Sequence, residues 1–229
     1  MKKKGFFWAS ITEKTVLALA GLFLVLFLLV HLGINLFILP IAPDHDEIFT
    51  EAAHFMGTNP VVRVFEVVLM AAFLVHIVLG ITVQIQNWKA RGKRYAVYGK
   101  SNVSFGSRFM IHTGIAIFLF LILHFINFYF VRLGIVEPIQ GADLATPHEE
   151  HFYQLAVYLF SNEILYSILY IVAFGFLAVH LNHAVQSAFQ TLGLNHPKYT
   201  PTIKTIGTIY AIVVSVGFTI IPLYFLITG

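Results

Sequence analysis

Hydrophobic residues in this chain fall into five long runs, and most charged residues lie in the segments between them. The runs cover residues 16–39, 61–85, 110–131, 164–185 and 206–227. As an α-helix, each run is long enough at ~1.5 Å per residue to cross a hydrocarbon core of ~30 Å. The pattern therefore predicts an all-α membrane protein in which residues 1–229 form one integral membrane domain with five transmembrane helices. The amphipathic stretch 148–160 is expected to lie at the membrane interface or to extend the fourth helix.

Composition narrows the chemistry that this chain can perform by itself. Hydrophobic residues make up 58% of the chain and charged residues 11%, which leaves no segment polar enough for a soluble domain. The first hydrophobic run is too long for the apolar part of a signal peptide, so we expect it to be retained as a helix. The chain has no cysteine, which excludes disulfides, thiolate haem ligation and iron–sulfur clusters ligated by this chain. Any such cluster would belong to a partner.

Charged residues also predict the orientation in the membrane. Basic residues gather before the first run and in the second and fourth connections, namely Lys2, Lys3, Lys4, Lys14, Lys89, Arg91, Lys93, Arg94, Lys100, Arg108, Lys198 and Lys204. Acidic residues gather in the first and third connections, namely Asp44, Asp46, Glu47, Glu51, Glu137, Asp143, Glu149 and Glu150. The positive-inside rule then places the N-terminus in the cytoplasm and the C-terminus outside. The pI near 9.1 reflects this topology, and we do not interpret it as nucleic-acid binding.

Four histidines lie inside four different hydrophobic runs, at depths that pair them. His31 and His124 follow the starts of the first and third runs by 15 and 14 residues, so both lie ~21–23 Å from the cytoplasmic side. The second and fourth runs cross in the opposite direction, and His76 and His180 lie ~23–24 Å from the outer side. The sequence therefore predicts an outer pair and an inner pair, with ~15 Å between the two levels.

Paired histidines at two levels indicate two b-type haems. Two neutral imidazoles fill both axial positions of a haem iron, which leaves no site for oxygen and favours one-electron transfer. A lone histidine in a membrane helix often only forms a hydrogen bond to a neighbouring helix, but four at matched depths are hard to explain in that way. His183 is the main rival of His180 as a ligand, because the two residues lie ~60° apart around the same helix.

Two glycines repeat the spacing of the histidines. Gly21 precedes His31 by ten residues, and Gly114 precedes His124 by ten. Ten residues span ~15 Å of helix, so each glycine is expected at the level of the other haem, where a missing side chain leaves room for the cofactor. Ordinary close packing of helices through small residues is the alternative.

The segments that contain these histidines resemble a known family. They read TVLALAGLFLVLFLLVHLGINLF, AAHFMGTNPVVRVFEVVLMAAFLVHIVLGI, LFLILHFINFYF and FGFLAVHLNHAVQ. They are similar to the cytochrome b membrane subunit of the succinate dehydrogenases and fumarate reductases, in the class in which one five-helix polypeptide carries two haems. The resemblance implies that the first four helices form a haem-binding four-helix bundle with the fifth packed alongside. It also implies that His76 and His180 ligate the proximal haem, and His31 and His124 the distal haem.

The same resemblance implies the partners and the setting of the protein. A flavoprotein subunit and an iron–sulfur subunit would dock on the cytoplasmic side of a bacterial inner membrane, for which the basic connection from Lys89 to Arg108 is a candidate surface. The dicarboxylate chemistry would belong to the flavoprotein, and this chain would exchange electrons with a quinone, by resemblance menaquinone. The direction of catalysis and a higher oligomer of the complex stay open.

Glu66 is the candidate for proton transfer to or from the quinone. It lies ~7.5 Å inside the second helix, where an acid is costly unless it is paired or functional. An ion pair with Arg63, three residues earlier, is the structural alternative. Family members carry an acid near the outer start of this helix that is linked to quinol protonation. Some fumarate reductases also carry an acid two residues before the histidine of the fourth helix, where this chain has Ala178.

Two other functions remain open from the sequence. A diheme cytochrome b of a hydrogenase or a formate dehydrogenase would also be a histidine-rich helical bundle, and its co-purifying partner would distinguish it. A transporter that uses membrane histidines for protons or metal ions would titrate or bind metal without a haem spectrum. No broken helix or further acid at the centre of a run supports the transporter.

Overall fold

The structure is a computed structural model that describes residues 10–90, 105–139 and 151–229. Every regular element in these ranges is a helix. Five helical segments within them are long and apolar enough to cross a membrane, namely Ile11–Ile38, Pro60–Lys89, Phe109–Arg132, Ile164–Thr191 and Thr200–Thr228. The predicted all-α membrane protein with five spans is therefore confirmed.

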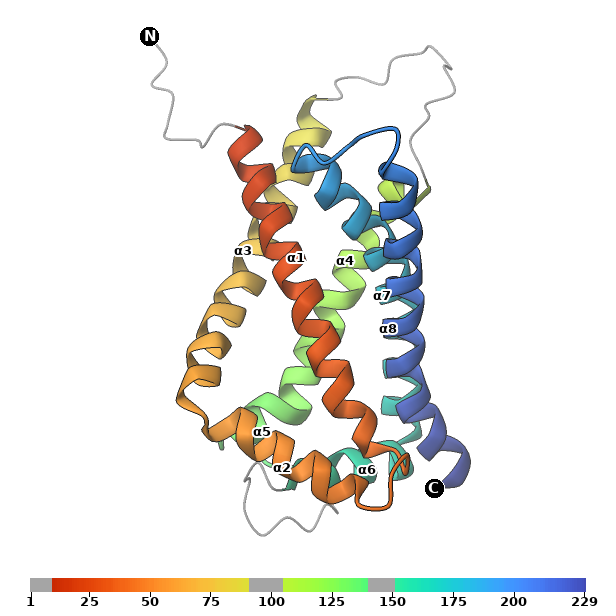
Figure 1. The fold of residues 1–229 in the computed structure, drawn as a ribbon. Coiled ribbons are helices and arrows are strands. Elements are labelled where there is room, and N and C mark those ends of the chain that lie inside the picture. The colour runs from red at the N-terminus through yellow and green to blue at the C-terminus, as the bar shows by residue number, and fades with distance from the viewer. Residues whose placement is uncertain (1–9, 91–104, 140–150) are drawn as a thin grey trace.

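The long helices run side by side, with the start of the first and the end of the last at opposite ends of the molecule (Figure 1). They are α1 (Ser10–Asn35), α3 (Pro60–Ala90), α4 (Phe105–His124), α7 (Ile164–Thr191) and α8 (Thr200–Thr228). We call the end at which α1, α4 and α8 begin the N-terminal end of the bundle, and the opposite end the C-terminal end. Most of these helices extend beyond the predicted runs, because their ends include polar and charged residues that lie outside the apolar windows. Helix α1, for example, includes Glu13 and Lys14.

Short helices lie at the C-terminal end of the bundle (Figure 1). They are η1 (Leu36–Ile38), α2 (His45–Thr58), α5 (Phe130–Arg132) and α6 (Phe152–Asn162). Helix α6 contains most of the amphipathic stretch expected before the fourth span, and it is separate from α7 because the backbone breaks at Glu163 (φ −111°, ψ 78°). Helix α2 was not predicted. Acidic Asp46 and Glu47 in its first turn favour its N-terminus through the helix dipole.

Local sequence explains where the second span begins. The side-chain oxygen of Asn59 accepts hydrogen bonds from the backbone N–H groups of Val61 (2.9 Å) and Val62 (3.3 Å), which makes Asn59 the N-cap of α3. Pro60 follows as the first helical residue, where its missing N–H costs nothing. The dipeptide Asn59-Pro60 therefore determines where α2 ends and α3 begins.

The third span contains an irregular segment. A π-helical turn, η2 (Phe125–Tyr129), separates α4 from the short α5. A π-turn widens the helix and rotates the residues that follow it, and such turns are frequent at functional sites. This segment begins directly after His124.

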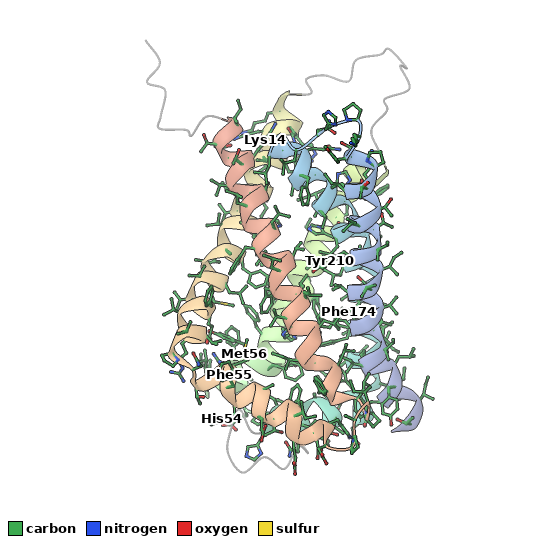
Figure 2. All side chains as sticks on the ribbon, in the orientation of Figure 1. Lys14, His54, Phe55, Met56, Phe174 and Tyr210 are labelled. Carbon is green, nitrogen blue, oxygen red and sulfur yellow. The ribbon has the colours of Figure 1, made fainter. Side chains whose placement is uncertain are left out.

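The best-packed part of the bundle lies between α7, α8 and α1. Its buried side chains include Leu32, Phe174, Val214 and Phe218. The hydroxyl of Tyr210 on α8 donates a hydrogen bond to the backbone carbonyl of Val25 on α1, and Figure 2 labels Tyr210 and Phe174 on this side of the molecule. Helix α3 packs mainly on α1 and exposes many large apolar side chains, as a lipid-facing helix must.

The two ends of the bundle differ in charge. Lys14 lies at the N-terminal end and His54 at the C-terminal end (Figure 2). Lys89, Lys198 and Lys204 belong to the helix ends and connection at the N-terminal end, whereas the acids of the first connection lie on or beside α2. The cytoplasmic position of the N-terminal end stays a prediction. Most of the expected docking connection (91–104) lies outside the described residues, as do Lys2, Lys3, Lys4, Asp143, Glu149 and Glu150.

Candidate functional site

Four helices each contribute one histidine to the interior of the bundle, and the rings meet in two pairs. The ring centres of His31 on α1 and His124 on α4 are 5.9 Å apart. Those of His76 on α3 and His180 on α7 are 6.4 Å apart. The structure therefore brings together the same pairs that the depths of the residues predicted. It is His180, rather than its rival His183, that faces His76.

The two glycines locate the pairs relative to one another. A Cβ atom on Gly21 would lie 3.3 Å from Cε1 of His76, and one on Gly114 would lie 3.7 Å from Cε1 of His180. Each glycine thus contacts a histidine of the inner pair and lies ten residues, or ~15 Å along its helix, from its own outer histidine. The two pairs are stacked along the bundle axis at about this separation. The role of the glycines in haem packing stays a prediction.

The donor set of each pair suits a haem. Two imidazoles bound to opposite sides of a metal ion have ring centres ~6.3 Å apart, because the metal–nitrogen bond is ~2.0–2.1 Å and the ring centre lies ~1.1 Å farther. The observed separations of 5.9 Å and 6.4 Å are close to this value. Each pair offers two nitrogens, which would hold the iron of one haem. The residues present therefore fit one haem at each level.

In His180 and His124, a hydroxyl oxygen lies beside Nδ1, which leaves Nε2 as the nitrogen for a metal. Nδ1 of His180 lies 3.2 Å from the hydroxyl of Thr113, and Nδ1 of His124 lies 3.4 Å from the hydroxyl of Tyr170. Nδ1 of His31 differs, because it lies 3.3 Å from the amide nitrogen of Asn35, which can only donate a hydrogen bond. Nδ1 of His76 is buried and has no side-chain hydrogen-bond partner among the described residues. The two hydroxyl contacts would orient the imidazoles of His180 and His124 as ligands and set their basicity.

Aromatic side chains line the outer pair. The ring of His31 stacks on Phe27, with centres 5.1 Å apart, and lies 5.7 Å from Phe218 of α8. The ring of His124 lies 5.8 Å from Phe120 and 5.3 Å from Phe128. Helix α8 was expected only to pack alongside the bundle, but through Phe218 it also forms part of the wall of this site. The surroundings are apolar, which favours a hydrophobic cofactor.

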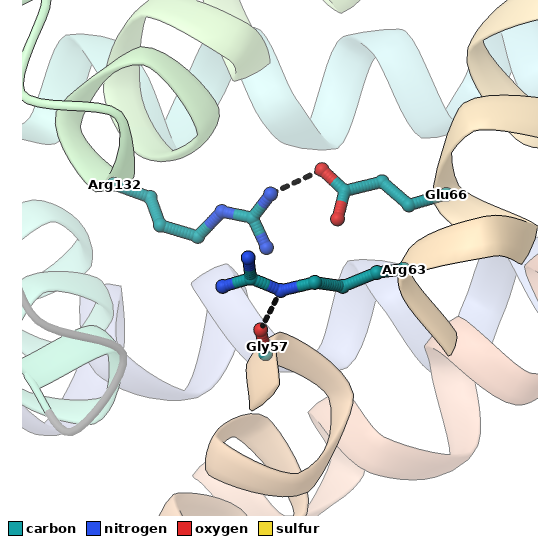
Figure 3. Close-up of polar contacts among 4 residues, drawn as sticks. All are labelled: Gly57, Arg63, Glu66 and Arg132. Atoms are coloured by element: carbon teal, nitrogen blue, oxygen red, sulfur yellow. Dashed lines mark hydrogen bonds and ion pairs between the residues drawn. The ribbon is translucent and has the colours of Figure 1, made fainter. Parts of the chain in front are cut away.

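Glu66 forms an ion pair at the C-terminal end of the bundle, and its partner is Arg132 of α5 (Figure 3). The pairing with Arg63, considered from the sequence, is wrong. The Nε–H of Arg63 instead donates a hydrogen bond of 2.8 Å to the carbonyl of Gly57 at the end of α2. The guanidinium of Arg132 also lies 5.1 Å from the ring centre of Tyr129 in the π-turn. Glu66 and Arg132 are about four-fifths buried.

The π-turn explains why Arg132 can reach Glu66. In an unbroken α-helix, Arg132 would be rotated ~80° away from His124, at ~100° per residue over eight residues. Five residues at roughly 4.4 per turn remove about 90° of that rotation and return Arg132 to the face that carries His124. The charged pair and the outer histidines therefore share one side of the third span. Nothing in the segment FINFY indicates this turn in advance.

Comparisons of the chain with known protein families, curated proteins and solved structures find no match.

Proposed function

We propose that this chain is the diheme cytochrome b membrane subunit of a succinate:quinone oxidoreductase, a succinate dehydrogenase or fumarate reductase. It would pass electrons between an iron–sulfur subunit and a membrane quinone. The proposal rests on two pairs of histidines at two levels of a five-span bundle. The ring centres are 5.9 Å apart in one pair and 6.4 Å apart in the other. The family is inferred from the resemblance of the sequence segments around these histidines.

The residues of each pair have defined tasks in this proposal. His76 and His180 would hold the proximal haem, and His31 and His124 the distal haem. A haem with two histidine ligands supplies one-electron transfer and has no open position for oxygen. The histidines fix its orientation, and the phenylalanines around the outer pair keep water away from it. A separation of ~15 Å between the levels is short enough for electron transfer along the bundle axis.

Proton transfer would take place at the C-terminal end of the bundle. Reduction of a quinone takes up two protons, and oxidation of a quinol releases them. Glu66 lies in the second turn of α3, at the end of the bundle nearer to the outer histidine pair, where a carboxylate can pass protons between the quinone and water. Arg132 holds the carboxylate in place. By resemblance to the diheme members of the family, the quinone would be menaquinone.

The partner subunits would dock at the N-terminal end, nearest to His76 and His180. This end carries Lys14, Lys89, Lys198 and Lys204, and the positive-inside rule places it in the cytoplasm of a bacterium. The flavoprotein subunit would oxidise succinate or reduce fumarate, and the iron–sulfur subunit would connect it to this chain. The chain itself would be the quinone-reactive part of the enzyme.

Purification of the intact membrane complex tests this proposal. We expect a flavoprotein and an iron–sulfur protein to co-purify, and we expect succinate oxidation or fumarate reduction coupled to a menaquinone analogue. Co-purification of a hydrogenase or a formate dehydrogenase would replace the proposed enzyme but keep the electron-transfer role. A chain without haem that binds metal ions or moves protons would favour a transporter and contradict the proposal.

A further inference from the structure

Helices α4 and α7 each carry a hydroxyl group that contacts the histidine of the other helix. Thr113 of α4 lies 3.2 Å from Nδ1 of His180 on α7. In the opposite direction, Tyr170 of α7 lies 3.4 Å from Nδ1 of His124 on α4. The two helices are antiparallel, and each hydroxyl precedes the histidine of its own helix by ten or eleven residues. The arrangement gives each histidine pair one hydroxyl partner.

The bonds of Thr113 determine which nitrogen of His180 carries hydrogen. Thr113 is buried, and its hydroxyl donates its only hydrogen to the backbone carbonyl of Met110 at 2.9 Å. The oxygen of Thr113 can therefore only accept a hydrogen bond from His180. Nδ1 of His180 must then carry the hydrogen, which leaves the lone pair of Nε2 free.

Tyr170 belongs to a short chain of polar groups. It is almost fully buried, at 3% exposure, and the amide of Asn127 in the π-turn donates to its hydroxyl oxygen at 3.4 Å. When Nε2 of His124 binds a metal, Nδ1 carries the hydrogen and the oxygen of Tyr170 is its acceptor. Asn127 and His124 then donate to the same oxygen, so the amide weakens the oxygen as an acceptor for His124.

We propose that Thr113 and Tyr170 are positioning residues, each of which orients one haem ligand and sets the reduction potential of one haem. The proposal rests on the proposed diheme function. A hydrogen bond from Nδ1–H to an oxygen makes the imidazole a stronger electron donor, which stabilises the ferric state. Removal of the oxygen should therefore raise the potential of the haem at that level and leave the other haem unchanged.

Measurement of both haem potentials in two variants of the purified complex tests which hydroxyl acts on which haem. The variants Thr113→Val and Tyr170→Phe remove one hydroxyl each while they keep the size of the side chain. We expect Thr113→Val to raise only the potential of the His76/His180 haem, and Tyr170→Phe only that of the His31/His124 haem. Each variant serves as the control for the other. Redox titration followed by optical and electron paramagnetic resonance spectra measures both haems separately.

Two further variants test the direction of the potential shift and the need for a hydroxyl group. Thr113→Ser retains the hydroxyl and should keep the potential of the inner haem near that of the wild type. Asn127→Leu removes a donor to the oxygen of Tyr170 and should lower the potential of the outer haem, in the direction opposite to Tyr170→Phe. A purely structural loosening of the site would not produce shifts of opposite sign.

The outcomes separate this inference from the proposed function. A wild-type complex without haem would contradict the proposed function itself. Two haems whose potentials do not respond to Thr113→Val or Tyr170→Phe, or respond to both equally, would contradict only the inference. If the Tyr170→Phe complex fails to assemble, Asn127→Leu still tests whether Tyr170 acts on the outer haem. A lower potential of that haem would support the inference, and an unchanged potential would contradict it.

Discussion

Gly21 of α1 lies directly against the imidazole of His76 on α3. A Cβ atom on Gly21 would come within 3.3 Å of Cε1 and 3.4 Å of Nδ1 of that ring. The distance of 3.3 Å is tighter than most real Cβ contacts, so a Cβ atom at this position would push the ring by a few tenths of an ångström. The absence of a side chain on α1 is therefore part of what fixes the position of His76.

Substitution of Gly21 by valine should remove the inner haem. The branched side chain displaces His76 from its place opposite His180, and overpacking of this kind costs about 1–3 kcal/mol. We expect the haem content to fall from two to one per chain. Gly80→Val is the matched control, because nothing lies within 4 Å of a Cβ atom at Gly80. A Gly21→Val protein with both haems would show that Gly21 is only a packing residue.

Alanine substitutions of the four histidines should separate into two classes. His76→Ala and His180→Ala should lose one haem, and His31→Ala and His124→Ala the other, because in the proposed function each pair would hold one haem iron. Optical spectra of the purified variants, with the remaining haem identified by its potential, measure this. Loss of the same haem from His31→Ala and His76→Ala would contradict the pairing.

Glu66→Gln should retain both haems but lose quinone turnover by about a hundredfold, the usual contribution of a proton-transferring group. Arg132→Gln should reduce turnover as well, because it removes the partner of the carboxylate. Arg63→Gln is the control from the same helix, since Arg63 bonds to the carbonyl of Gly57. Turnover with a menaquinol analogue measures all three. Normal turnover in Glu66→Gln would remove Glu66 from the site.

The orientation of the bundle can be measured cleanly because the chain has no cysteine. Single cysteines at the exposed positions Glu51 and Lys198 would lie at opposite ends of the bundle. In intact cells, a membrane-impermeant maleimide should label Glu51→Cys, and it should label Lys198→Cys only after permeabilisation. The reverse pattern would place the N-terminus outside and overturn the docking side proposed for the partners.

The sequence was sufficient to predict the spans and which histidines lie opposite one another. Both depend on one-dimensional quantities, namely the length of an apolar run and the number of residues between its start and His31, His76, His124 or His180. Depth along a helix can be counted from the sequence. Rotation about the helix axis cannot be counted when a helix is apolar on all sides, as these spans are.

The residues that sequence reasoning missed are those that depend on rotation or on a break in a helix. Thr113 and Tyr170 carry ordinary hydroxyl groups, and they became candidates only when α4 and α7 were placed against one another. The sequence suggested Arg63 as the ion-pair partner of Glu66, because Arg63 is only three residues away, and it did not suggest Arg132. The pairing with Arg132 depends on the π-turn at Phe125–Tyr129, for which the sequence contains no signal.

The central claim is that two histidine pairs hold two haems, and haem quantification on the purified wild-type complex tests it most directly. A reduced-minus-oxidised spectrum, combined with a pyridine haemochrome assay, gives the type and number of haems per chain. The account predicts two b-type haems per chain, both with spectra of low-spin iron bound by two histidines. A complex that is fully assembled but contains no haem would contradict it.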